Sequence, residues 1–158
     1  MRIRIGNRSM LASFVLSVAM LQSCDFETSD NGDLDGFWHM ESVDTLSTGG
    51  TLDLSQQRVF WAFSVKLMRL SDQDGQRADL YMRFKHEGDL LNVYEPYSNQ
   101  GHEQETDGAY GGDIPLEDAS LLAPYGIDGL QDQFTVEGLN GSRMILKSEK
   151  LRLKFKKF

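Results

Sequence analysis

The sequence predicts an all-β domain, built as an antiparallel sandwich or barrel of about seven short strands. Two observations predict it. Apolar and polar residues alternate along several short segments, and clusters of Gly, Asn and Asp separate those segments. Such alternation places one face of each strand in a core and the other face in water. One domain is the expected number for 158 residues, and a chain of this size can bury a core.

Residues 1–23 are expected to be a secretory signal peptide. The segment begins with Arg2, Arg4 and Arg8 and contains no acidic residue. An apolar run follows over residues 10–21, interrupted only by two serines. A bilayer span needs roughly 20 apolar residues, so this run is too short to be a transmembrane helix.

Cys24 is the only cysteine and follows Leu21-Gln22-Ser23 directly. This arrangement resembles the lipobox of bacterial lipoproteins, in which Leu, a variable residue and a small residue precede the modified Cys. The resemblance implies cleavage before Cys24, a diacylglyceryl thioether on its sulfur and an acylated amino group, which makes a lipid bilayer the expected partner. The alternative is a free, buried Cys behind an ordinary signal.

Residues 24–33 are expected to form a flexible acidic tether, because they contain too few apolar residues to bury. Acidic residues behind a lipidated Cys also resemble the surface-export signal of Bacteroidetes lipoproteins, and the alternative is a plain solvated spacer. The expected location is therefore the bacterial outer membrane, on its periplasmic or its cell-surface face.

Regular structure is expected from Leu34 onward. Residues 58–70 are the strongest strand candidate, with an uninterrupted apolar face of Val59, Trp61, Phe63, Val65 and Leu67. Residues 78–85 alternate in the same way, and residues 90–95 form the next strand after a Gly-containing turn.

The C-terminal part repeats the pattern. Residues 133–139 and 142–148 flank Asn140-Gly141, a strong signal for a tight hairpin turn. Residues 151–156 alternate apolar and basic side chains, which predicts a closing strand with its basic face in water.

Two other segments lie between these halves. Residues 98–112 are rich in Gly and acidic residues and are expected to form a mobile loop. Residues 115–123 are expected to form one short helix across the mouth of the sheet, with Leu116, Ala119 and either Leu122 or Ala123 facing inward.

With these elements in place, the chain resembles the lipocalin-like domains of Bacteroidetes lipoproteins over Leu34–Phe158. The resemblance is carried by Gly36-Phe37-Trp38, which matches the Gly-x-Trp that opens such a barrel, and by the ending Leu151–Phe155. It implies an up-and-down barrel of seven to eight strands with one short helix, whose interior holds a small apolar ligand or is filled by side chains. In this family a basic residue of the last strand packs over the Trp. Arg152 is the closest match, although alternation turns it away from the core.

The candidate ligand-binding residues are the aromatic and apolar side chains of the central strands, namely Trp61, Phe63, Leu80, Met82, Phe84 and Tyr94. The alternative is that they are simply core. No cofactor is expected, and the histidines have no metal-ligand spacing. The acidic loop with His102, Glu103, Glu105, Asp107 and Asp113 is more typical of a solvated loop than of a Ca²⁺ site.

These features leave three functional hypotheses. The first is a lipid-anchored lipocalin-like protein that binds a small apolar ligand in or at the barrel. The second is an accessory lipoprotein with a filled barrel that contacts another envelope protein. The third is an enzyme, which is not expected because no nucleophile can be paired with a base. The net charge of −8 argues against nucleic acid as a partner.

Overall fold

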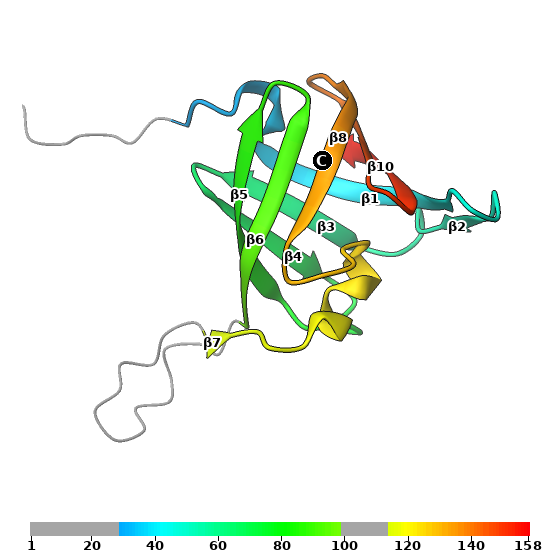
Figure 1. The fold of residues 1–158 in the computed structure, drawn as a ribbon. Helices are drawn as coiled ribbons and strands as arrows, with labels where there is room; N and C mark the ends of the chain where they lie inside the picture. Colours follow the sequence, from blue (N-terminus) through cyan, green and yellow to red (C-terminus); the bar gives the residue numbers. More distant parts are fainter. Residues whose placement is uncertain (1–28, 99–113) are drawn as a thin grey trace, which may run out of the picture.

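The chain folds into a closed antiparallel β-barrel in the computed structural model, which describes residues 29–98 and 114–158 (Figure 1). Each barrel strand pairs with the next one along the chain, and the last strand pairs with the first to close the ring. The barrel strands are β1 (Gly36–Thr45), β3 (Val59–Ser64), β4 (Leu67–Asp72), β5 (Leu80–Glu87), β6 (Leu90–Ser98), β8 (Asp132–Leu139), β9 (Arg143–Lys147) and β10 (Leu151–Lys157). The up-and-down barrel is thereby confirmed and the sandwich is excluded.

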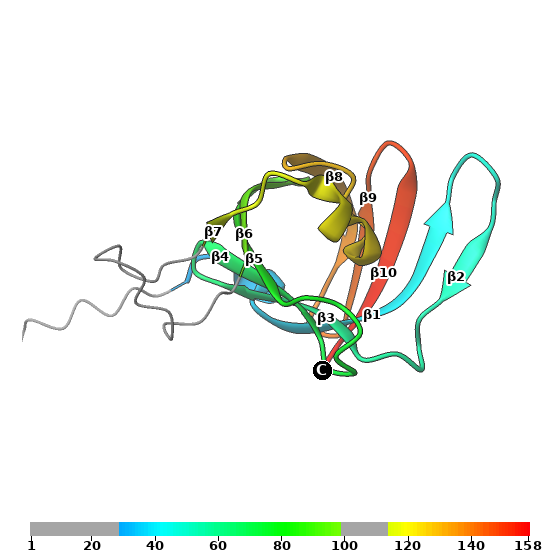
Figure 2. The ribbon, with the colours of Figure 1, turned by 90° about the horizontal axis from the view of Figure 1, so that it is seen from below.

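Two short strands lie outside this ring. Strand β2 (Thr51–Asp53) pairs with the second half of β1, and the resulting hairpin extends away from the barrel (Figure 2). Strand β7 (Ile114–Pro115) pairs with the end of β6. Neither strand contributes a buried side chain.

The predicted strand at residues 58–70 is two strands joined by a tight turn. Ser64 of β3 pairs with Leu67 of β4, so Val65 and Lys66 form the turn. Val65 adopts a φ of 55°, which is rare for a β-branched residue, and the Asn31 side chain donates a hydrogen bond of 2.9 Å to its carbonyl. The prediction that Val65 and Leu67 share the inner face of Trp61 is therefore wrong. Sequence analysis missed this turn because the residues from Ser64 to Leu67 include no Gly, Asn or Pro.

One end of the barrel is closed by the short 3₁₀ turn η2 (Gly32–Leu34). The indole Nε1 of Trp38 donates a hydrogen bond of 2.7 Å to the Leu34 carbonyl. The Lys157 ammonium lies over the Trp38 indole, 4.9 Å from its centroid, and donates a hydrogen bond of 2.8 Å to the Asp33 carbonyl. Gly36 has a φ of 117°, and a Cβ there would lie 3.0 Å from the Lys157 side chain, so this position requires Gly.

The structure corrects the prediction for the basic residue that packs over Trp38. It is Lys157, whereas Arg152 points outward and binds Glu137. The described end of the predicted tether also contacts the barrel, through Asn31 and Asp33.

The opposite end of the barrel is covered by the segment that was predicted to be one helix. It forms two 3₁₀ turns, η3 (Ala119–Leu121) and η4 (Ala123–Tyr125), which lie across the mouth (Figure 2). Pro115 belongs to β7 instead of a first helical turn, and Ala123 is exposed whereas Leu122 is buried. Leu122, Tyr125 and Ile127 join the core.

Side chains from every barrel strand meet in one hydrophobic core inside the barrel. No helix among the described residues is long and apolar enough to cross a membrane. The predictions for the signal peptide, for Cys24 and for the acidic loop with His102 and Glu103 fall outside the described residues.

Candidate functional site

The predicted ligand-binding residues of β3 and β5 all point into the barrel. Trp61, Phe63, Leu80, Met82 and Phe84 are between 0% and 3% exposed. The structure thus brings together five of the six candidates.

These interior side chains pack against one another. The Trp61 ring lies 5.7 Å from that of Phe134 and 5.1 Å from that of Phe155, between ring centroids. The Phe63 and Phe84 rings meet edge to face at 5.0 Å. In this conformation the candidate residues form the packed core of the barrel.

Tyr94 lies elsewhere. It is half-buried on the outer face of β6, where it borders a shallow hollow together with Asn92 and Gln133. Alternation along β6 places Tyr94 on the face opposite Leu91 and Val93, which are both buried in the core.

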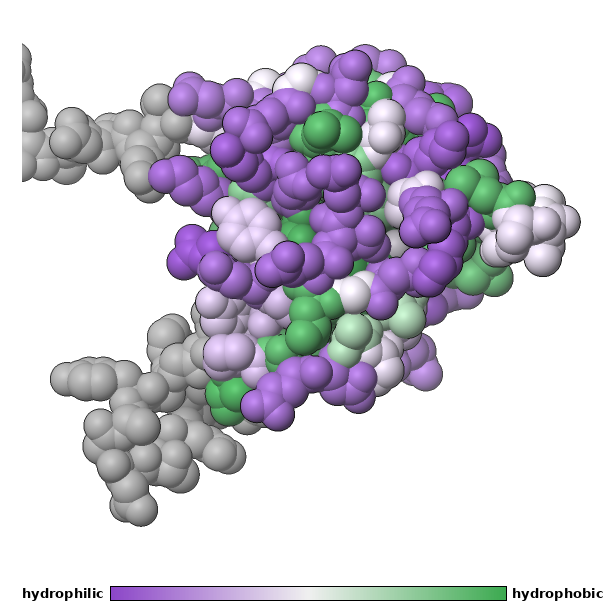
Figure 3. Space-filling view, in the orientation of Figure 1, coloured by the Kyte–Doolittle hydropathy of each residue, from purple (hydrophilic) through white to green (hydrophobic). Residues whose placement is uncertain are grey.

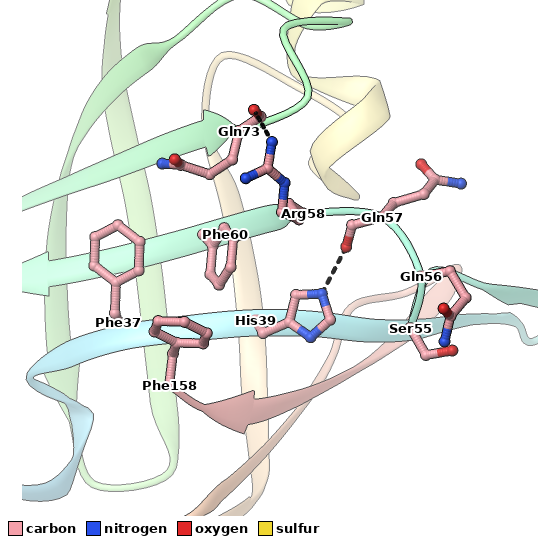
Figure 4. Close-up of a pocket in the computed structure, with 9 residues that line it drawn as sticks. All are labelled: Phe37, His39, Ser55, Gln56, Gln57, Arg58, Phe60, Gln73 and Phe158. Carbon is pink, nitrogen blue, oxygen red and sulfur yellow. Dashed lines mark hydrogen bonds between the residues drawn. The ribbon is translucent and has the colours of Figure 1, made fainter.

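A hollow with an aromatic floor lies on the outside of the barrel, over β1 and β3 (Figure 4). Its volume is about 350 Å³, within the range of small-molecule sites. We call it the aromatic groove, and it is lined by Phe37, His39, Ser55, Gln56, Gln57, Arg58, Phe60, Gln73 and Phe158.

Phe60 is the centre of this groove. It is only 5% exposed although it points away from the core, because three other rings surround it. The ring centroids of Phe37, His39 and Phe158 lie 5.2, 5.1 and 5.4 Å from that of Phe60. Phe158, the last residue, is 87% exposed and is held by a backbone hydrogen bond to the Phe37 carbonyl.

The polar wall of the groove is held in place by hydrogen bonds. The two ring nitrogens of His39 each lie 2.6 Å from an oxygen, one of Glu41 and one of the Gln57 backbone. Arg58 binds Asp74 through its backbone N–H and its guanidinium, and these bonds keep the pKa of Asp74 below its usual range. The groove therefore combines an apolar floor with a fixed polar rim.

Sequence reasoning missed this groove. Phe37 and Phe60 occupy outward positions of β1 and β3, and Phe158 directly follows β10. Only the pairing of β1 with both β3 and β10 brings the three rings together. A signal was present, since each is a large aromatic residue at a position that alternation assigns to water.

Within residues 29–98 and 114–158, no group of three His, Cys, Asp or Glu side chains could hold a metal ion. What the groove offers is apolar surface with hydrogen-bonding groups at its edge.

A family model described as the lipocalin-like domain matches residues 19–158. The chain belongs to this lipocalin-like family. No curated protein matches the chain.

Two solved structures share the lipocalin-like fold. A lipocalin-like protein from Bacteroides uniformis is 19% identical, with a TM-score of 0.57, and the match covers 80% of this chain and 100% of that one. An uncharacterized protein from Bacteroides eggerthii is also 19% identical, with a TM-score of 0.54 and coverage of 79% and 99%. At this identity the likeness shows the fold alone. The lipocalin-like barrel with its Gly-x-Trp opening was thus predicted from the sequence.

Proposed function

We propose that this protein is a lipid-anchored, lipocalin-like binding protein of the cell envelope, which binds a small and largely apolar ligand in the aromatic groove. The observation that carries this proposal is the contrast between the two aromatic clusters. The inner cluster around Trp61 is packed against its neighbours, whereas the outer cluster around Phe60 borders a hollow of about 350 Å³.

The anchor in this proposal is Cys24, at the outer membrane. Two or three acyl chains on this residue would hold the barrel at a bilayer, since each buried CH₂ contributes about 0.8 kcal/mol. Palmitate labelling tests the assignment. Cys24→Ser should abolish labelling and release the protein from the membrane fraction, and labelling that persists would refute the anchor.

The filled interior also favours a second candidate, an accessory lipoprotein that uses its outer surface to contact another envelope protein. The same groove would then hold an apolar side chain of that partner. Binding of a free small molecule separates the two candidates.

Binding of the neutral dye phenylnaphthylamine, measured by its fluorescence, tests the groove. The protein used comprises residues 24–158 and carries Cys24→Ser. The double variant Phe37→Ala/Phe158→Ala should weaken dye binding by about tenfold or more, because it removes apolar contact area at the floor. Leu52→Ala, which truncates an exposed side chain on β2, is the matched control and should bind normally. Unchanged binding in the double variant would refute the groove as the site.

A further inference from the structure

We propose that the groove ligand is an amphiphilic anion, with its apolar body in the aromatic groove and its carboxylate or phosphate-type group on Lys156 and Arg143. This inference rests on the proposed function and adds the chemical class of the ligand. Lys156 and Arg143 are called the cation pair below.

The cation pair continues a row of outward side chains that begins in the groove. Cross-strand pairing sets Phe60 of β3 opposite His39 of β1, and His39 opposite Lys156 of β10. Lys156 is in turn opposite Arg143 of β9. Lys156 is one strand away from His39, which borders the groove, and Arg143 is two strands away. Neighbouring strands lie roughly 4.8 Å apart, so both cations are close to the groove.

The cation pair has no acidic partner among the described residues. Neither Lys156 nor Arg143 forms an ion pair with a described carboxylate, whereas the other cations on the outer face of β9 and β10 are paired as Lys154–Asp44, Arg152–Glu137 and Lys147–Glu137. Like charges directly opposite each other destabilise a sheet. An anion bound between them would relieve this repulsion.

A second hollow lies beside the cation pair. It has a volume of about 410 Å³ and is lined by residues of β1, β9 and β10, among them Ile145 and both cations. Glu41 borders it as well, but its Oε1 lies 2.6 Å from Nδ1 of His39, so the imidazole holds this carboxylate. Among the residues that the structure describes, no carboxylate forms an ion pair with either member of the cation pair, which leaves both members to an external anion.

The chemistry of the two hollows defines the ligand. The planar guanidinium of Arg143 matches the two oxygens of a carboxylate or phosphate group, and the Lys156 ammonium adds a second positive charge. The rings of Phe60, Phe37 and Phe158 suit an apolar body. Only a molecule with both parts uses both sites.

Two dyes that share one aromatic skeleton test this class. Anilinonaphthalene sulfonate carries an anionic group that phenylnaphthylamine lacks. In residues 24–158 with Cys24→Ser, the anionic dye should bind about tenfold more tightly than the neutral one, as one added charge-assisted contact predicts. Added salt should reduce this preference.

Substitution of the cation pair then tests whether the anionic group of the dye binds there. Arg143→Gln/Lys156→Gln should abolish the preference and leave binding of the neutral dye unchanged. Lys147→Gln/Lys150→Gln makes the same change in net charge at the turn end of the β9–β10 hairpin and should keep the preference. Equal affinity for the two dyes, or a preference that survives in Arg143→Gln/Lys156→Gln, would overturn the inference. Failure of the proposed function is distinct, since it would leave both dyes insensitive to Phe37→Ala/Phe158→Ala.

Discussion

At the scale of single residues, Trp38 shows how the sequence builds the closed end. Its ring is buried in the core and lies under the ammonium of Lys157, which also donates a hydrogen bond to the Asp33 carbonyl. Lys157→Met should remove the cation–π contact and this hydrogen bond, and should lower the free energy of unfolding by about 1–2 kcal/mol. Chemical denaturation measures the change.

The neighbour Lys156 provides the control for this prediction. It is exposed and makes no ion pair with a described residue, so Lys156→Met should change stability by less than about 0.5 kcal/mol. Equal effects at both positions would contradict the role assigned to Lys157.

Glu137 introduces a dependence on pH. Hydrogen bonds from Arg152 hold the pKa of Glu137 below its ordinary value of 4.5. Because the pKa is lowered in the folded state, the stabilisation is complete above pH 4.5 and is lost as the pH falls toward the folded-state pKa. Wild type should therefore melt at a higher temperature than Glu137→Gln at about pH 7, and this difference should shrink at about pH 3.

Glu149→Gln is the control for the pH effect, because Glu149 is exposed and has no ion pair within the part of the chain that the structure describes. Its melting temperature should follow that of wild type at both pH values. A gap between wild type and Glu137→Gln that stays constant with pH would rule out the ion pair as its cause.

At the scale of elements, strands β3 and β5 test the alternation of faces. Phe63→Ala and Phe84→Ala should each cost about 3–5 kcal/mol, because both rings lie in the core. Ser64→Ala and Lys85→Ala change outward neighbours and should each cost under about 0.5 kcal/mol. Similar costs on both faces in urea unfolding would show that the register is wrong.

The segment over the mouth offers a similar contrast between adjacent residues. Leu122 is fully buried, whereas Leu121 is 47% exposed. Leu122→Ala should lower the free energy of unfolding by about 2–5 kcal/mol, and Leu121→Ala should stay within about 0.5 kcal/mol. If the two variants unfold at the same denaturant concentration, the segment does not contribute to the core.

The sequence predicted those features that depend on local pattern. Alternation identified Trp61, Phe63, Leu80, Met82 and Phe84 as one inner face, because burial on one side of a strand leaves a period of two. Features that depend on pairing could not be predicted. The turn at Val65 and the partner of Trp38 are fixed by which strands meet. The burial of Leu122 and Tyr125 at the mouth comes from contacts with the barrel core, which no local pattern shows.

The aromatic groove escaped prediction for the same reason. Its rings come from β1, from β3 and from the final residue of the chain, and no local pattern joins them. Five of the six candidate pocket residues, all except Tyr94, lie together inside the barrel, where they pack against one another.

At the scale of the whole molecule, the barrel interior is occupied by core side chains, and we propose that the ligand binds outside it, in the aromatic groove. Methionine methyl groups can test this claim directly. Met40, Met68, Met82 and Met144 are all fully buried in the core. They are the only methionines in residues 24–158, so selective labelling reports on the interior alone.

The deciding measurement is an NMR titration of methyl-labelled residues 24–158, carrying Cys24→Ser, with phenylnaphthylamine. If the ligand binds in the aromatic groove, the backbone amide signals of His39, Arg58 and Phe158 should shift with saturation while the four methionine methyl signals stay in place. Large, saturable shifts of the Met68 and Met82 methyl signals, with the groove amide signals unmoved, would place the ligand inside the barrel and refute the groove as its site.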